Sequence, residues 1–336
     1  MINFIGTMKI LILLETLNGI RSLMVDELLK MHHEVTVYPN EIPKYRYTFF
    51  DKINNLLSLD KKRISRKREN HLREESSREI NQIISKNYDL IIVFRPDSYE
   101  KNFLIKLKNQ TKRMVAYQWD GIERYPKVKE YIPIFDEFYC FNPPECGDEI
   151  KFLPNFYFEN LVKYPLPDKN GDFIYIGYYD ELRQKALSKM SKELKDTSLS
   201  YKFELKSFDK KNKEKLITDN PEIKFIDEIY DYETLFDIHK NYKVFIDIKQ
   251  PIHEGLSFRF FEALVLQSKI ITNNVSIKTY NFYHPNNILV VDWEKITKKE
   301  ILDFFAIPYY PINPKIVEEY SFKNWINKIE KKDITG

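Results

Sequence analysis

Two glutamates in the last third of the chain have a spacing that could do chemistry. Glu254 stands between His253 and Gly255, and Glu262 follows after seven intervening residues. The stretch comes after the apolar run 244–248, so we expect a strand, a loop and then a helix. At the carboxyl edge of a parallel sheet, free N–H groups and the helix dipole attract phosphate at such a helix start. The sequence therefore predicts an anion site beside Glu254.

The predicted helix carries one charged pair on an otherwise apolar surface. Arg259 and Glu262 are three positions apart and share one face, whereas the other side carries Ser257, Phe260, Phe261 and Leu264. An ion pair at a solvent edge contributes only about 0.3 kcal/mol. The pair is therefore either an ordinary surface contact or part of the anion site.

The elements that must position these residues follow from alternating short apolar runs and helix-period stretches. This alternation is typical of doubly wound parallel sheets, so we predict an α/β fold with two Rossmann-like domains. Predicted strands lie at 10–14, 89–94, 114–117, 137–141, 151–153, 173–176, 201–205, 223–226, 244–248, 270–272 and 288–291, and a further β-rich run ends the segment that closes at Pro39. The predicted organisation is a domain at 1–156, a linker at 157–171, a second domain at 172–312 and a helix at 313–336 that packs back on the first domain.

Composition excludes several classes of function. The 336 residues include 53 Lys+Arg, 50 Asp+Glu and 43% apolar residues, which argues against a disordered or polybasic chain. The eight glycines cannot form a dinucleotide fingerprint or a Walker A loop, so a nicotinamide-dependent dehydrogenase is disfavoured. Two cysteines, Cys140 and Cys146, match neither a disulfide framework nor a common zinc spacing, which predicts a cytoplasmic chain without a bound metal or cofactor.

An insertion at 45–86 separates two strands of the first domain. It begins with aromatic and apolar residues, and seven cations then fall within 61–73. One interpretation is a long solvated helix hairpin. The other is docking to an anionic membrane surface through 45–73, which would place the protein peripherally on the inner face of the plasma membrane. Nucleic acid is disfavoured, because the net charge is only +3 and no known binding module is present.

The segment Glu254-Gly-Leu-Ser-Phe-Arg-Phe-Phe-Glu262-Ala-Leu264 resembles the signature of retaining, family 4-like bacterial glycan glycosyltransferases of the GT-B class. In that class two Rossmann-like domains face each other across a cleft. The resemblance implies that Glu254 contacts the donor sugar as a catalytic residue and that Glu262 binds the nucleotide ribose. It also implies that the backbone of Gly255, Leu256 and Ser257 faces the diphosphate. We expect the two carboxylates to converge on one hollow.

The start of the second domain resembles the same class more loosely. Phe173 to Gly177 corresponds to the family's strand and glycine turn, and Arg183 to its phosphate-facing basic residue. Arg259 is an alternative for that role, since a guanidinium and a helix N-terminus can stabilise a diphosphate leaving group without metal. No Asp-x-Asp sequence is present, which fits a metal-independent transferase. His253 is expected to line the donor pocket.

The acceptor side is predicted in the loop after the strand at 114–117. Asp120 there could position or deprotonate an acceptor hydroxyl, and it could equally cap a helix or turn. Trp119 and Arg124 could provide a sugar-stacking surface and an anion contact, although a tryptophan at a strand end often belongs to the core.

These observations lead to a functional prediction with two alternatives. The prediction is a glycosyltransferase that moves a sugar from a nucleotide-sugar donor to a glycan or glycolipid acceptor, such as lipopolysaccharide, capsule or a lipid-linked glycan. Retention at the anomeric carbon is implied by the resemblance alone. One alternative is a non-catalytic nucleotide-sugar-binding subunit that regulates or scaffolds a partner. The other is an interaction protein with no small ligand.

Overall fold

The computed structural model describes residues 6–15, 19–39, 74, 76–207, 217–218 and 221–331. The predicted membrane-docking segment 45–73 lies outside these residues. The chain forms two compact units, each with parts from several stretches of sequence. The first contains Met1–Thr16, Leu28–Tyr117 and Lys127–Glu137, and the second contains Leu17–Glu27, Gln118–Pro126 and Phe138–Gly336.

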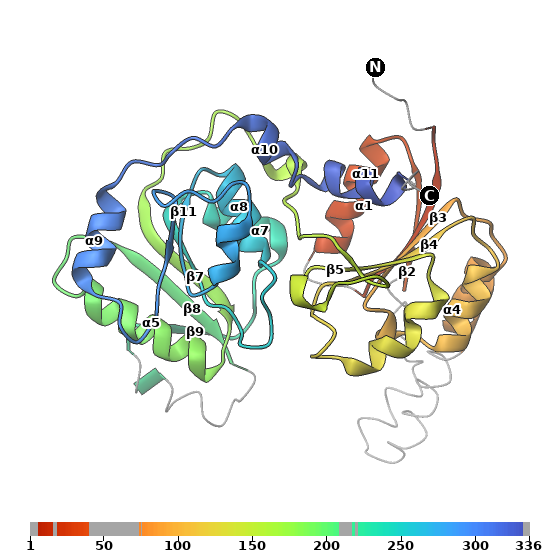
Figure 1. Cartoon of the computed structure of the whole chain (residues 1–336), viewed down its shortest axis with the longest axis horizontal. Coiled ribbons are helices and arrows are strands. Elements are labelled where there is room, and N and C mark those ends of the chain that lie inside the picture. The colour runs from red at the N-terminus through yellow and green to blue at the C-terminus, as the bar shows by residue number, and fades with distance from the viewer. Residues whose placement is uncertain are drawn as a thin grey trace, which may run out of the picture. The chain divides into compact units, whose positions relative to one another are not determined.

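The first sheet has six strands in the order β2-β1-β3-β4-β5-β6, and its described registers are parallel (Figure 1). Its inner strands are continuous apolar runs, as expected for a sheet that is covered on both faces. The strands are β1 (Lys9–Leu13), β2 (Glu34–Tyr38), β3 (Leu90–Phe94), β4 (Met114–Gln118), β5 (Glu137–Cys140) and β6 (Lys151–Phe152).

Helices cover this sheet because their apolar residues recur on one side. On α4 (Lys101–Lys108), Phe103, Leu104 and Leu107 are buried against β1 and β3. The other described helical elements between β1 and β7 are α1 (Ile20–Lys30), η1 (Pro96–Ser98), η2 (Pro126–Ile134), η3 (Pro143–Glu145) and η4 (Glu159–Leu161).

The second sheet has the order β12-β11-β10-β7-β8-β9, again with parallel registers. The chain runs outward from β7 to β9 and then returns to the other side of β7 with β10. The boundary between β7 and β10 is therefore the topological switch point, where α/β sheets bind ligands at the strands' carboxyl ends. The strands are β7 (Gly171–Tyr178), β8 (Tyr201–Lys206), β9 (Lys224–Ile226), β10 (Tyr242–Asp247), β11 (Lys269–Thr272) and β12 (Ile288–Val290).

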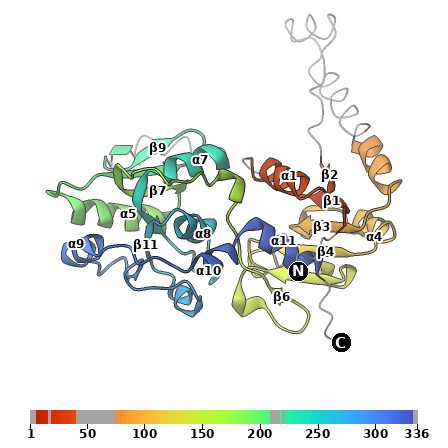
Figure 2. The same ribbon diagram turned by 90° about the horizontal axis from the view of Figure 1, so that it is seen from above.

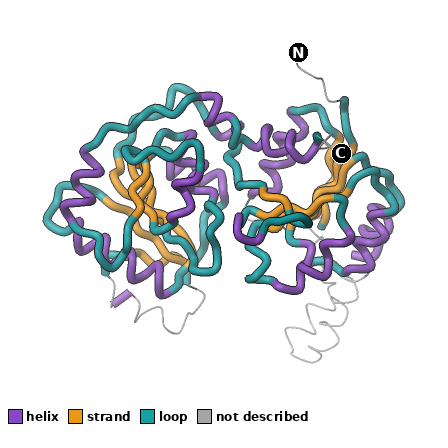
Figure 3. The backbone as a smooth tube through the Cα atoms, in the orientation of Figure 1, coloured by secondary structure: helices purple, strands orange, loops and turns teal. Residues whose placement is uncertain are grey.

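Alternate residues of β7 face opposite layers of helices, as the period of a strand requires. Phe173 and Tyr175 pack with α5 (Glu181–Leu194) and α9 (Lys298–Ala306), whereas Ile174 and Ile176 pack with α7 (Tyr232–His239) and α8 (Phe258–Val265). Figures 1 and 3 show the strands of this sheet at the centre with helices outside them.

The chain end packs within the second unit through α10 (Pro314–Glu318) and α11 (Phe322–Glu330), which Figure 2 shows from above. Tyr157 and Ser321 form a parallel bridge, and the ring of Trp325 lies 4.9 Å from that of Phe156. Aromatic contacts therefore hold α11 against the start of the predicted linker.

All twelve predicted strands are present, and the bounds of the eleven that were predicted with residue numbers differ by at most two residues. The prediction of two Rossmann-like α/β domains is confirmed. Within the described ranges, no helix combines the length and the apolar character needed to cross a membrane.

Candidate functional site

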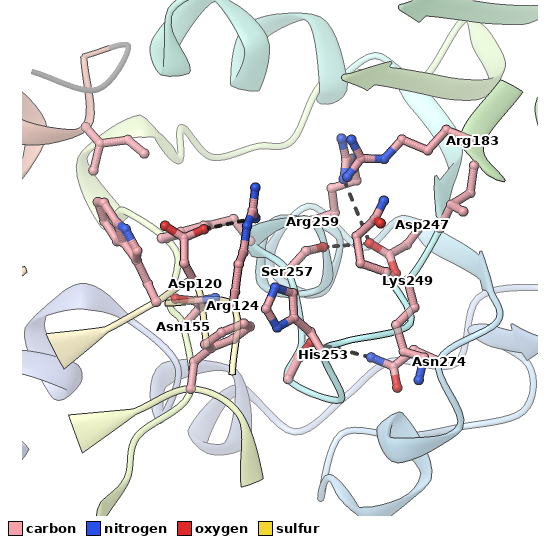
Figure 4. A pocket seen from close by; sticks show the side chains of 17 residues that line it. Asp120, Arg124, Asn155, Arg183, Asp247, Lys249, His253, Ser257, Arg259 and Asn274 are labelled. Carbon is pink, nitrogen blue, oxygen red and sulfur yellow. Dashed lines mark hydrogen bonds and ion pairs between the residues drawn. The ribbon is translucent and has the colours of Figure 1, made fainter. Parts of the chain in front are cut away.

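A pocket of about 340 Å³ lies in the second unit at the carboxyl ends of β7 and β10 (Figure 4). This is the switch point of the sheet, and the volume falls in the range of small-molecule sites. Four cationic side chains and two carboxylates contribute to its lining, so the fixed charge favours an anionic ligand. They are Arg124, Arg183, Lys249, Arg259, Asp120 and Asp247.

Arg259 is fixed against the end of β7. It stands in the first turn of α8, and its Nη2 donates a hydrogen bond of 2.6 Å to the carbonyl of Ile176. Its guanidinium lies over the ring of Tyr175 at 4.7 Å. A Cβ on Gly177 would approach Arg259 Nη2 to 3.2 Å, so the glycine leaves room for the guanidinium. Gly177 itself does not contribute to the pocket lining.

Arg183 reaches the same part of the pocket from the start of α5. Asp180 caps this helix by accepting the backbone N–H of Arg183 at 2.9 Å, and Arg183 Nη1 donates to the carbonyl of Tyr178 at 2.9 Å. Burial raises the pKa of Tyr175, and the charges of Arg259 and Arg183 oppose that rise. Both guanidiniums are therefore close to Tyr175, and we call this region the cationic end of the pocket.

Asp247 is a pocket residue that sequence reasoning missed. It ends β10, is 4% exposed, and accepts hydrogen bonds from Ser257 Oγ at 2.7 Å and Thr272 Oγ1 at 3.1 Å. Its Oδ1 also lies 3.8 Å from Arg259 Nη1. The sequence did contain a sign of this residue, because a carboxylate inside the apolar run 244–248 is unusual for a buried strand. Lys249, Asn155 and Asn274 also line the pocket without having been predicted.

The loop before α8 is already hydrogen-bonded on its backbone. Asn142 Oδ1 accepts the N–H groups of Glu254 at 2.8 Å and of Gly255 at 3.1 Å. The expectation that the Gly255 amide faces a diphosphate is therefore wrong for this structure. A Cβ on Gly255 would lie 2.5 Å from the carbonyl oxygen and Cδ2 of Phe141, so glycine permits this close approach.

Leu256 is 1% exposed and lies in the core rather than in the pocket. Its carbonyl accepts a hydrogen bond of 2.9 Å from Asn155 Nδ2. Ser257 lines the pocket and is the N-cap residue of α8. The described contacts include no side-chain cap on this helix start. The N–H of Phe260 donates to the carbonyl of Ser257 at 3.2 Å, and the described contacts leave the N–H groups of Phe258 and Arg259 available to an anion.

Neither Glu254 nor Glu262 belongs to the pocket lining in the described part of the chain, and the predicted convergence of the two carboxylates is wrong. Glu254 pairs with Lys249. Glu262 is 2% exposed, and its Oε2 lies 2.8 Å from Nδ1 of His239 on α7. A solvent-edge ion pair with Arg259 is excluded by the same burial.

The electrostatics around Glu262 explain how a buried carboxylate is tolerated. Burial acts to raise its pKa, but the hydrogen bond from His239 and the nearby positive charge lower the pKa below its ordinary value of 4.5. Glu262 is therefore ionised at neutral pH and joins α8 to α7.

The loop at 118–126 brings the predicted acceptor residues to the pocket. Glu145 fixes this loop, because its carboxylate accepts the N–H groups of Ile122 at 2.8 Å and Glu123 at 2.9 Å. Burial acts to raise the pKa of Glu145, and these N–H groups lower it below its usual range. Asp120 lies 3.4 Å from Arg124 Nη1, and both line the pocket.

Trp119 and His253 complete the part of the pocket near this loop. The ring of Trp119 meets Phe258 edge-on at 6.4 Å, so it is partly a packing residue as well as a lining residue. His253 packs edge-on against Phe141 at 5.6 Å. Burial and the charge of Arg124 lower the pKa of His253 below 6.5, although Asp120 and Glu145 act in the opposite direction.

The structure thus gathers most, but not all, of the predicted site residues in one pocket. Those that line it are Trp119, Asp120, Arg124, Arg183, His253, Gly255, Ser257 and Arg259. Those that do not are Gly177, Glu254, Leu256 and Glu262.

No protein-family model matches the chain, and no curated protein matches it by sequence. Solved structures do match. AviGT4, a glycosyltransferase involved in avilamycin A biosynthesis, has a TM-score of 0.62 with 10% identity and 96% coverage of both chains. An alpha-glucosyltransferase in complex with UDP-glucose and DNA containing an abasic site has a TM-score of 0.58 and 12% identity, covering 96% of this chain and 93% of that chain.

A third similar structure is the apo form of WaaB, a lipopolysaccharide outer core galactosyltransferase. It has a TM-score of 0.51 and 14% identity, with coverage of 96% of this chain and 98% of that chain. Identities this low establish the fold alone. The chain therefore has the two-domain α/β fold of the GT-B glycosyltransferases.

Proposed function

We propose that this protein is a glycosyltransferase that binds a nucleotide-sugar donor in the pocket at the β7/β10 switch point. The observation that carries the proposal is the cationic end, where Arg183 and Arg259 stand beside the uncapped start of α8. A nucleoside diphosphate is the anion that this arrangement suits, because guanidiniums and helix N–H groups bind phosphate oxygens. The shared GT-B fold supports the same assignment.

The proposed reaction breaks the bond between the sugar and the diphosphate. Negative charge develops on the leaving phosphate oxygen, and Arg183 and Arg259 are placed to stabilise it without a metal ion. Asp247 helps to position Arg259, because its Oδ1 lies 3.8 Å from Arg259 Nη1 and also accepts a hydrogen bond from Ser257 Oγ. The resemblance assigns donor-binding roles to Glu254 and Glu262, but neither side chain lines the pocket in this structure, so the proposal does not rest on them.

For the acceptor we propose a bacterial surface glycan or glycolipid, taken up on the side of Trp119, Asp120 and Arg124. Asp120 would orient the attacking hydroxyl and accept its proton. The fold shared with WaaB and the basic, aromatic character of 45–73 support this choice. Retention at the anomeric carbon belongs to the proposal on the resemblance alone, and NMR of the first-formed product would test it.

The test begins with ligand-induced stabilisation by UDP-, GDP-, ADP- and CMP-sugars, followed by hydrolysis and transfer assays with and without a chelator. One donor should raise the midpoint of unfolding, and turnover should persist in the chelator. The variant Arg259→Gln should weaken binding of the donor and its nucleoside diphosphate about tenfold or more, because a charged hydrogen bond to phosphate is lost. Lys295→Gln, which removes a cation that is exposed on the protein surface, should leave binding unchanged.

The outcomes separate the alternatives. Tight binding without hydrolysis or transfer would favour the regulatory or scaffold subunit. Isomerisation of the nucleotide sugar without transfer would replace the transferase by another enzyme class. If no nucleotide sugar stabilises the protein, the assignment of the pocket is wrong.

A further inference from the structure

We propose that the imidazole of His253, rather than the carboxylate of Glu254, hydrogen-bonds the sugar of the bound donor. The inference rests on the proposed function and names the residue that distinguishes a nucleotide sugar from the bare nucleoside diphosphate. It is carried by the contrast between two adjacent residues, only one of which lines the pocket.

Glu254 does not line the pocket, and its backbone and carboxylate are both engaged by neighbouring side chains. Its N–H donates to Asn142 Oδ1, and its carbonyl accepts hydrogen bonds from Asn274 Nδ2 at 3.1 Å and from Ser276 Oγ. Its carboxylate is paired with Lys249. To contact a sugar in the pocket, the carboxylate would have to leave its cation and turn a backbone that three groups fix.

His253 has the opposite arrangement, with a fixed ring and unused polar atoms. Neither Nδ1 nor Nε2 has a hydrogen-bond partner among the described residues, and both atoms are buried. The ring is held by Phe141 and by Gly121, where a Cβ would lie 2.7 Å from the imidazole. Buried polar atoms in folded proteins are paired, so a positioned imidazole with two unused nitrogens indicates a missing ligand group.

The charge of the ring selects the kind of ligand group. Burial, Arg124 and Lys249 lower the pKa of the imidazole below 6.5 against the opposing charges of Asp120 and Glu145, so the ring is neutral at neutral pH. A neutral imidazole presents one donor and one acceptor. A sugar hydroxyl can pair with either nitrogen, as acceptor or as donor, whereas an ionised phosphate oxygen can only accept.

The position of the ring agrees with this choice. His253 contacts the loop at Gly121, whereas Arg183 and Arg259 meet at Tyr175 in the cationic end. Figure 4 shows His253 on the side of the pocket that also carries Arg124. A diphosphate at the guanidiniums would therefore direct its sugar toward the imidazole.

The test compares a nucleotide sugar with its own nucleoside diphosphate, using UDP-glucose and UDP or the matched pair from the donor panel that stabilises the protein most. In His253→Phe, which keeps an aromatic ring in the packing, the affinity for the nucleoside diphosphate should change less than about twofold. The ratio of the affinity for the nucleotide sugar to the affinity for the nucleoside diphosphate should fall about tenfold or more, and kcat/KM should fall by a similar factor. His253→Asn, which keeps one donor and one acceptor, should restore part of the loss.

The matched control is His284→Phe, because His284 stacks on Tyr310 at 3.9 Å away from the pocket. The wild-type preference for the nucleotide sugar should also decline as the pH falls through a pKa below 6.5, because protonation removes the acceptor on the ring. His253→Asn should lack that decline, and thermal unfolding should show that each variant is folded.

Three results would overturn the inference. An unchanged preference for the nucleotide sugar in His253→Phe would show that the imidazole does not contact the sugar, with the proposed function intact. An equal loss of nucleotide sugar and nucleoside diphosphate in a folded variant would place His253 at the phosphates. Absence of binding in the wild-type protein would reject the inference and the proposed function together.

Discussion

At the scale of single residues, the contact between Glu262 and His239 shows how a motif carboxylate can serve packing. The carboxylate is 2% exposed, and the hydrogen bond of 2.8 Å to His239 joins α8 to α7. Burial beside Glu262 also raises the pKa of Tyr232. The cluster is therefore a polar connection inside an apolar layer, where losing one partner costs more than the pair contributes.

We expect Glu262→Gln to lower the free energy of unfolding by about 1–3 kcal/mol near neutral pH, because the charged acceptor is lost. The folded-state pKa of Glu262 is depressed, so its contribution is present above the unfolded value near 4.5 and is lost as the pH falls through the lower folded value. Urea unfolding at several pH values measures this. Glu294→Gln, at an exposed position, is the control, and a difference from wild type that does not shrink in acid would contradict the interpretation.

At the scale of elements, the site depends on how closely the loop before α8 approaches the end of β5. Gly255 lies against Phe141, and Asn142 accepts two N–H groups of the same loop. The helix start, with Ser257 and Arg259, follows directly. A displacement of this loop therefore moves the groups that we expect to bind phosphate.

The variant Gly255→Ala should test this dependence. The added Cβ would lie 2.5 Å from the carbonyl oxygen of Phe141, so the loop must shift, and we expect a loss of about 1–3 kcal/mol in stability together with weaker donor binding. Gly147→Ala is the matched control, because a Cβ there meets no atom within 4 Å, and its effect should stay within about 0.5 kcal/mol. Calorimetry and a binding titration give both values, and equal effects of the two variants would refute the argument.

At the scale of the whole molecule, β1, β2 and β3 belong to the first unit, whereas every strand of the second sheet and the candidate pocket belong to the second unit. A ligand that binds only the folded structure stabilises it, and the stabilisation grows with the logarithm of the ligand concentration above Kd. Local opening is suppressed most where the bound groups lie.

Hydrogen exchange with a saturating nucleotide sugar should therefore protect the backbone amides of the β7 and β10 ends, the first turn of α8 and residues 118–126. The amides of β1 and β3, which belong to the first unit, should exchange as in the free protein. Mass spectrometry of peptides resolves these segments. Protection centred on β1 and β3 would instead place the donor in the first unit.

The sequence by itself determined the strands, the parallel sheets and the region of the site. Continuous apolar runs such as 89–94 and 173–176 have no solvated face, so they required buried strands whatever their neighbours. The loop before α8 was predictable because a strand followed by a helix places its connection at the carboxyl edge.

The tertiary structure alone decided which side chains line the pocket. Glu254 and Glu262 have the predicted spacing, but their directions depend on Lys249 and His239, which approach from other elements. Asp247 and Asn155 line the pocket because segments that are distant in sequence meet there. Spacing along a chain fixes the face of a helix on which a residue lies. The partner of its side chain depends instead on contacts between residues that are far apart in sequence.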